Sequence, residues 1–104
     1  MKLLILMASN PYSADFNTMV KFSEAAIKRK DEISIFLMAN GVYCLNHDKM
    51  KELAEKGVKI YYCAHNAHQR KINPVDFAES SSMYGLSKLI SQVDKVINLS
   101  LIHI

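Results

Sequence analysis

Short apolar runs alternate with segments of helical periodicity along the chain, and this alternation restricts the fold more than any other feature. The strand-like runs cover Leu3–Met7, Ile33–Met38, Val58–Tyr62 and Val96–Leu99. The first of them is apolar throughout, which is typical of a strand covered on both faces. Strands that alternate with helices through short connections form βαβ units and a parallel sheet. The sequence of 104 residues therefore predicts one compact three-layer domain over residues 1–104.

Helical patterns fill the intervals between these runs. The first predicted helix begins after an N-cap at Ser13 and continues to about Lys30. Asp48 is expected to cap a second helix, which Gly57 ends in the C′ position. Another helix is predicted over 83–92, and Cys63 is expected to open a polar helical segment. The pattern gives no element for residues 75–80, and it leaves open whether the apolar tail 101–104 extends the last strand or covers an edge.

Composition and charge exclude several classes of function. The formal net charge is only +3, and the thirteen cations are scattered among ten anions, so no basic stripe for a nucleic acid is present. No apolar stretch approaches the length needed to span a bilayer. The apolar run after Lys2 is shorter than the core of a signal peptide and is broken at Ser9-Asn10-Pro11. We therefore expect a cytoplasmic protein with reduced cysteines and with no nucleic-acid or membrane partner.

Three predicted loops leave the carboxyl ends of strands, where α/β proteins place their ligands and chemistry. These loops are Ser9–Ser13, Asn40–Cys44 and Cys63–His65. None contains a phosphate-binding fingerprint, and the whole chain has three glycines, so a nucleotide is not expected. The loops supply a thiol, hydroxyls, an amide and tyrosines. That set suits a small nucleophilic pocket better than a cofactor cleft.

Cys63 is the strongest candidate for a nucleophile. It ends a β-branched and aromatic run and opens a polar segment that contains two histidines and two cations. The helix dipole and the nearby positive charge favour the thiolate there. The alternative is a packed cysteine, because free cysteine is among the most buried residue types. Cys44 has no charged neighbour in the sequence and is the weaker candidate.

Other catalytic and metal sites find less support. Cys63, His65 and His68 have metal-like spacing, but Cys63 points away from the helical face that the two histidines share, which favours solvent-facing histidines. The sequence has no C-x-x-C pair, which a structural zinc site would need, and no G-x-S-x-G elbow, which a serine hydrolase would need. The carboxylates have the pattern of solvated helix positions rather than of an acid–base pair; they are Asp15, Glu24, Asp48 and Glu52.

Four segments in this order resemble the DsrE/DsrF-like family, which includes the TusD-like and YchN-like sulfur-relay proteins. They are Phe36–Val42, Gly57–Cys63, Gly85–Leu89 and Val93–Ile97. The most specific parts are the N-G-V-Y turn, the strand-terminal cysteine and the closing D-K-V-I strand. The resemblance covers nearly the whole chain. The chain departs from the YchN-like pattern in having Asn66 in place of a second cysteine.

The resemblance implies a three-layer α/β domain with a mainly parallel sheet flanked by helices in a flavodoxin-like topology. It also implies a sulfur carrier, or sulfurtransferase subunit, in which Cys63 accepts sulfur as a persulfide and passes it to a partner thiol without a metal or an organic cofactor. Backbone N–H groups from Ala64 onward and the side chain of Arg70 are then expected to stabilise the anion. Asn10 and Tyr43 are expected to line the pocket.

Sulfur donor and acceptor proteins are the partners that the resemblance implies, together with further copies of the chain in a trimer or hexamer. Exposed aromatic and apolar residues favour an oligomer on physical grounds as well, because a subunit interface would cover them. The residues concerned are Tyr61, Tyr62, Tyr84, the six methionines and the apolar C-terminus. Two other functions stay open, which are an oligomeric binding or regulatory protein with a packed Cys63 and a metal-binding module.

Overall fold

The computed structural model describes residues 1–99, which form a five-stranded parallel sheet in the order β4-β3-β2-β1-β5. The elements in chain order are β1 (Lys2–Met7), α1 (Ala14–Lys28), β2 (Glu32–Leu37), the 3₁₀ helix η1 (Ala39–Asn46), α2 (Asp48–Glu55), β3 (Lys59–Cys63), α3 (Ala64–Gln69), β4 (Glu79–Ser81), α4 (Met83–Gln92) and β5 (Lys95–Leu99).

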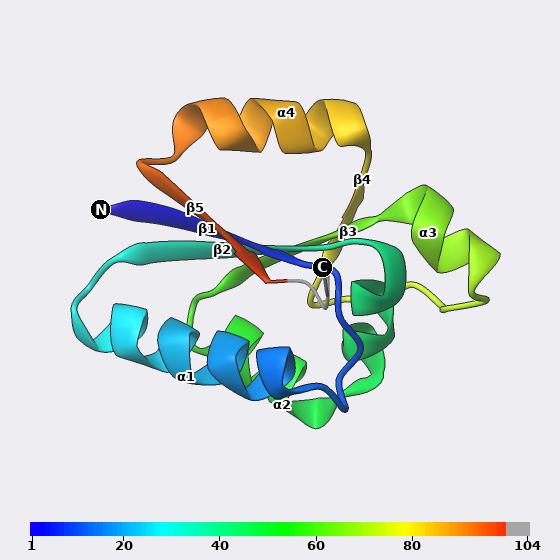
Figure 1. Ribbon diagram of the computed structural model, residues 1–104, viewed down its shortest axis with the longest axis horizontal. Helices are drawn as coiled ribbons and strands as arrows, with labels where there is room; N and C mark the ends of the chain where they lie inside the picture. The colour runs from blue at the N-terminus through cyan, green and yellow to red at the C-terminus, as the bar shows by residue number, and fades with distance from the viewer. Residues whose placement is uncertain (100–104) are drawn as a thin grey trace.

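Helices cover both faces of the sheet, but unequally. Figure 1 shows α1 and α2 together on one face, α4 alone on the other, and α3 extending beyond the end of β3. The chain moves in one direction from β1 through β2 and β3 to β4, and then reverses to reach β5. Because connections between parallel strands are right-handed, this reversal puts α4 on the opposite face. The predicted three-layer α/β architecture is confirmed.

The strand order is a variant of the flavodoxin-like order. In the flavodoxin-like order, 2-1-3-4-5, the edge strand next to β1 is the second strand of the chain. Here the edge strand next to β1 is β5, which comes last. The layout in space is the same, and only the stage at which the chain forms that edge differs.

The sheet separates two hydrophobic clusters of different size. Leu3, Ile5 and Met7 of β1 belong to the larger cluster, which α1 and α2 cover. Leu4 belongs to a smaller cluster on the α4 face, because side chains alternate between the faces of a strand. In the smaller cluster Leu4, Phe36, Cys63 and Leu86 are buried.

The sequence located most elements correctly and some details wrongly. The helix predicted over 83–92 is found with those bounds. Asp48 is not the N-cap of α2, because His47 holds that position and its Nδ1 accepts a hydrogen bond from the Lys49 N–H (3.1 Å). The helix η1 and the strand β4 were not predicted. The tail 101–104 lies outside the described residues.

Two glycines have a structural reason. Gly57 follows α2 with φ +101°, which agrees with the C′ position predicted for it. Gly41, in the N-G-V-Y turn, lies against the backbone of Met7 at the end of β1. A Cβ at Gly41 would collide with the Met7 carbonyl oxygen and would lie 2.8 Å from its carbon. The turn after β2 can therefore pass this close to β1 only with glycine.

Candidate functional site

The loops at the carboxyl edge of the sheet are joined to one another by hydrogen bonds. The Cys44 thiol of η1 donates to the Ser9 carbonyl in the loop after β1 (3.7 Å). The Ala39 N–H at the start of η1 donates to Oδ1 of Asn66 in α3 (2.9 Å). The structure thus brings the three predicted loops to one edge, as expected for parallel strands.

Cys63 is the last residue of β3 and directly precedes α3, which is the position predicted from the sequence. Its side chain is turned toward α4, because Tyr62 faces the larger cluster and alternation sends the next residue to the other face. It is 5% exposed and packs in the cluster with Leu4, Phe36 and Leu86. The Cys63 thiol is therefore covered by α4 and does not lie in an open pocket.

The residues beside Cys63 show that it lies close to the surface. In the register between β3 and β4, Cys63 pairs with Ser81, which is half-buried. In the register between β2 and β3, Leu37 pairs with Tyr62, so the next residue, Met38, lies opposite Cys63. Met38 is extended and half-buried, and it packs against the Cys63 cluster. Cys63 thus lies close to the surface, with a half-buried residue on each side of it in the sheet.

Sequence reasoning missed both flanking residues. Which residue lies beside Cys63 depends on strand register, and β4 gave no apolar pattern from which a register could be proposed. One signal was available for Met38. It closes the second apolar run as Cys63 closes the third, and equivalent ends of adjacent parallel strands lie side by side.

Cys44 is a buried structural thiol. It is 0% exposed in the larger cluster on the α1 and α2 face. Burial raises the pKa of Cys44 from 9.0 to about 12, although an interaction of the thiol with the backbone of Cys44 itself lowers the pKa. Because the thiolate is the nucleophilic form of cysteine, Cys44 is unsuited to nucleophilic chemistry at neutral pH.

Arg70 lies at the end of α3 but is engaged in a different role from the one predicted. Its Nε donates to Asn40 Oδ1 (3.1 Å) and its Nη1 donates to the Asn66 carbonyl (3.3 Å). Among the hydrogen bonds found over residues 1–99, none connects Arg70 with Cys63. The guanidinium instead ties α3 to the loop after β2.

The other predicted pocket residues lie at the same edge but outside the cluster around Cys63. Asn10 uses its Oδ1 to accept the Tyr12 N–H (2.8 Å), which stabilises the turn after β1. Tyr43 is 39% exposed on η1. Ala64 is exposed at the first position of α3, directly after Cys63.

The metal-binding alternative receives no support from the geometry. His65 and His68 are exposed on α3, whereas the Cys63 side chain is buried under α4. Within residues 1–99, no group of three or more His, Cys, Asp or Glu side chains lies close enough together to hold a metal ion. Cys63, His65 and His68 therefore do not form the three-ligand set that their spacing suggested.

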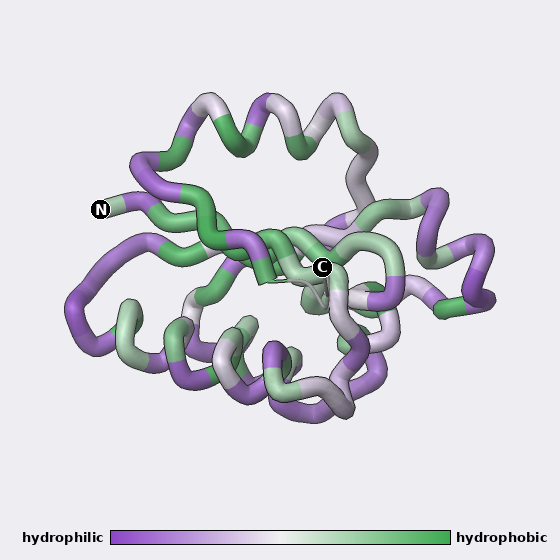
Figure 2. The backbone as a smooth tube through the Cα atoms, viewed as in Figure 1, coloured by the Kyte–Doolittle hydropathy of each residue, from purple (hydrophilic) through white to green (hydrophobic). Residues whose placement is uncertain are grey.

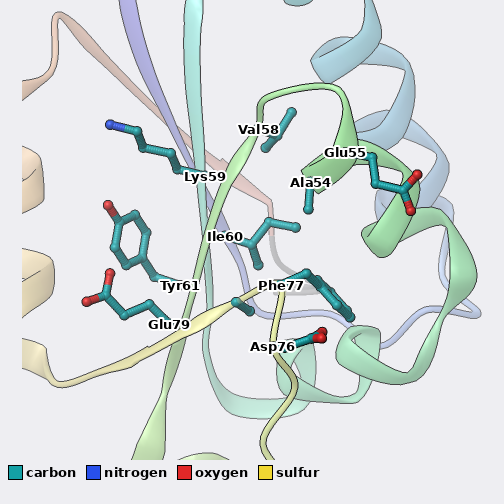
Figure 3. A pocket seen from close by; sticks show the side chains of 10 residues that line it. Ala54, Glu55, Val58, Lys59, Ile60, Tyr61, Asp76, Phe77 and Glu79 are labelled. Atoms are coloured by element: carbon teal, nitrogen blue, oxygen red, sulfur yellow. The ribbon is translucent and has the colours of Figure 1, made fainter.

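A groove of about 640 Å³ lies at the opposite end of β3 from Cys63 (Figure 3). Lys59 and Tyr61 of β3 and Glu79 of β4 line one part of it, and Val58 and Phe77 line another. Cys63 does not line this groove. We therefore place the candidate site at the thiol on the carboxyl edge and not in this groove.

No helix within residues 1–99 combines the length and apolar character that crossing a membrane requires.

Comparison with known proteins agrees with this architecture. The YchN protein from E. coli has a similar fold, with a TM-score of 0.85 at 17% identity over 95% of this chain and 99% of that chain. A conserved protein of unknown function from Bacteroides thetaiotaomicron gives a TM-score of 0.73 at 17% identity over 94% of each chain. A protein of unknown function from Methanobacterium thermoautotrophicum gives 0.78 at 11% identity, over 94% of this chain and 98% of that one.

At these identities the likeness to solved structures concerns the fold alone. A search of the curated proteins finds no match to the sequence. The model of the DsrE/DsrF-like family, by contrast, matches residues 1–99, which contain every element described above. The chain belongs to the DsrE/DsrF-like family.

Proposed function

We propose that the protein is a sulfur carrier that accepts sulfur as a persulfide on Cys63 and passes it to the thiol of a partner protein. The observation that carries the proposal is the position of Cys63 at the junction of β3 and α3, where it is 5% exposed and lies between half-buried neighbours. Family membership supports it, because the family includes sulfur-relay proteins. The burial of Cys44 leaves Cys63 as the better placed of the two thiols.

Transfer to Cys63 requires no external oxidant or reductant. The Cys63 thiolate attacks the outer sulfur of a donor persulfide, a bond forms between Sγ and that sulfur, and the donor S–S bond breaks. The donor leaves as a thiolate, and Cys63 becomes a persulfide. An acceptor thiolate then attacks the outer sulfur in the same way and restores the Cys63 thiolate, as in thiol–disulfide exchange. Each step conserves the number of S–S bonds.

The cover over Cys63 has a use in this chemistry. A persulfide reacts readily with other thiols and with oxidants, and a covered site restricts such side reactions to the moments when the site opens. The cover consists of Leu86, which α4 contributes to the cluster around Cys63, and of Met38 and Ser81, which flank Cys63 within the sheet. A carrier of this kind requires a reducing compartment such as the cytoplasm, in which Cys63 stays a free thiol.

The α4 face of the protein offers a surface for partners and for further copies of the chain. Several apolar side chains on α4 and β5 are exposed; they are Met83, Tyr84, Ile90 and Val96. Figure 2 shows the alternating apolar and polar residues of α4 above the sheet. Tyr62 does not contribute, because it is 5% exposed in the core. We assign this face to a homo-oligomer interface or to the sulfur donor and acceptor proteins, since it adjoins Cys63.

Mass spectrometry tests the proposal directly. The protein is incubated with inorganic polysulfide, desalted, and digested to locate any added sulfur. The wild type and Cys44→Ser should gain one sulfur on Cys63, and Cys63→Ser should gain none. A low-molecular-weight thiol should then remove that sulfur. Sulfur that is found equally in Cys63→Ser, or that never forms on Cys63, contradicts the proposal.

A second function is favoured by one specific observation. The 5% exposure of Cys63 among apolar side chains also fits a binding or regulatory protein in which this cysteine only packs. Iodoacetamide labelling across pH separates the two functions. A thiol that reacts only in denaturant indicates the packed role, whereas labelling of the native protein below pH 7 indicates the carrier.

A further inference from the structure

We propose that Asn66 and Arg70 are positioning residues that hold Met38 beside Cys63 and so control access to the thiol from the α3 side. The importance of this for sulfur transfer rests on the proposed function. The inference about access rests on hydrogen bonds and register alone.

The turn after β2 has a strained conformation that requires support. Ala39 has φ +49°, in the left-handed region that a residue with a side chain seldom adopts. Its N–H donates to Asn66 Oδ1, 27 residues away in sequence, at 2.9 Å. The Asn66 side chain therefore compensates the backbone at the one residue of this turn whose conformation is unfavourable.

Arg70 makes the connection between α3 and the turn two-sided. Its Nε donates to Oδ1 of Asn40, the residue after Ala39, and its Nη1 donates to the backbone carbonyl of Asn66. The bond to the Asn66 carbonyl is part-buried, so water competes less for it than for the exposed bond to Asn40. Asn66 and Arg70 therefore hold the two neighbouring residues Ala39 and Asn40. Asn66 lies in α3 and Arg70 is its C-cap, and this helix begins directly after Cys63.

Met38 connects this clamp to Cys63. It directly precedes Ala39, and its N–H donates to the Met7 carbonyl (3.0 Å), which keeps its backbone in the sheet. Its side chain packs against the cluster that contains Cys63. If the Ala39 turn loses its hydrogen bond to Asn66, the left-handed conformation loses its support. The chain from Met38 onward can then relax away from Cys63.

The test measures the rate at which iodoacetamide labels Cys63 in the native protein, with the labelled site identified by digestion. Asn66→Ala should label about tenfold faster than the wild type, because it removes one hydrogen bond to a strained turn. Asn66→Asp keeps an oxygen that accepts the Ala39 N–H and should stay within about twofold of the wild type. His68→Ala, on an exposed position of α3, serves as the matched control and should not change the rate.

A general loss of stability is separated by repeating the labelling at low urea concentrations. Opening of the clamp alone exposes little surface, so the rate for Asn66→Ala should depend only weakly on urea. Arg70→Gln gives a second perturbation of the same clamp should Asn66→Ala fold poorly, and it should also accelerate labelling. An unchanged rate in both variants, or a rise that follows global unfolding, overturns the inference and points to access past Ser81. No sulfur donor is present, so the outcome is independent of the polysulfide experiment.

Discussion

The close approach between the turn after β2 and the end of β1 makes Gly41→Ala a sharp test of the structure. The new Cβ would collide with the Met7 carbonyl oxygen, a backbone atom at the end of β1 that the neighbouring strands β2 and β5 hold in place. Overpacking of this kind costs about 1–3 kcal/mol. The Met7 carbonyl also accepts the Met38 N–H (3.0 Å), and losing that bond adds about 1 kcal/mol.

Together these terms predict a loss of about 2–4 kcal/mol in the free energy of unfolding. With a urea m-value of about 1.5 kcal/mol/M, the unfolding midpoint should fall by about 1–3 M. The measurement is urea unfolding followed by far-UV circular dichroism. Because the collision is transmitted to Met38, Cys63 should also label faster with iodoacetamide.

Gly85→Ala provides the matched control. A Cβ at Gly85 would meet the Ser81 Oγ, which is the end of a side chain that can rotate away. Gly85 lies in α4, where alanine is favoured over glycine by about 1 kcal/mol. Gly85→Ala should therefore unfold within about 1 kcal/mol of the wild type. The reasoning is refuted if Gly41→Ala has the wild-type midpoint, or if Gly85→Ala is destabilised as much as Gly41→Ala.

Three further predictions concern the cover, the buried thiol and a helix cap. Leu86→Ala should lower the unfolding free energy by about 2–4 kcal/mol and accelerate iodoacetamide labelling of Cys63, because Leu86 is 4% exposed in the same cluster as Cys63. A labelling rate equal to that of the wild type would contradict the conclusion that Leu86 covers Cys63. The pKa of Cys44 is raised to about 12, so the folded protein retains this proton more tightly than the unfolded chain. The resulting stabilisation is complete below the ordinary pKa of 9.0 and should decline by about 1.4 kcal/mol per pH unit as the pH rises toward 12. Urea unfolding measured across alkaline pH checks this, and the unfolding free energy of Cys44→Ala should decline less than that of the wild type. His47→Ala should cost about 1 kcal/mol in thermal or urea unfolding, since it removes the acceptor for the Lys49 N–H, and Lys49→Ala should cost less because its N–H remains.

Local patterns were sufficient for elements that carry their own signal. The helix over 83–92 has apolar residues at helical spacing and a serine at its N-cap, and Ser82 Oγ accepts the Gly85 N–H (3.2 Å) as such a cap should. By contrast, β4 has three residues, Glu-Ser-Ser, with no apolar alternation. It is a strand because β3 offers an edge to pair with, and that partner lies far along the chain.

The candidate site divides in the same way. The end of an apolar run followed by a polar segment located Cys63 at the carboxyl edge correctly, since the period and the break are local. The family resemblance implied that Arg70 would stabilise the thiol anion. In the fold Arg70 binds Asn40 instead, because the parallel arrangement brings the loop after β2 beside α3.

The order of strands and helices, and the place of Cys63 at the end of one strand, follow from hydrophobic periodicity within short stretches of the chain. What surrounds that thiol depends on the tertiary structure. Its cover by Leu86 and its neighbours Met38 and Ser81 arise from strand register and from the reversal of the chain that brings α4 across the sheet. Packing between segments far apart in sequence decides both, and no local pattern of residues records such packing.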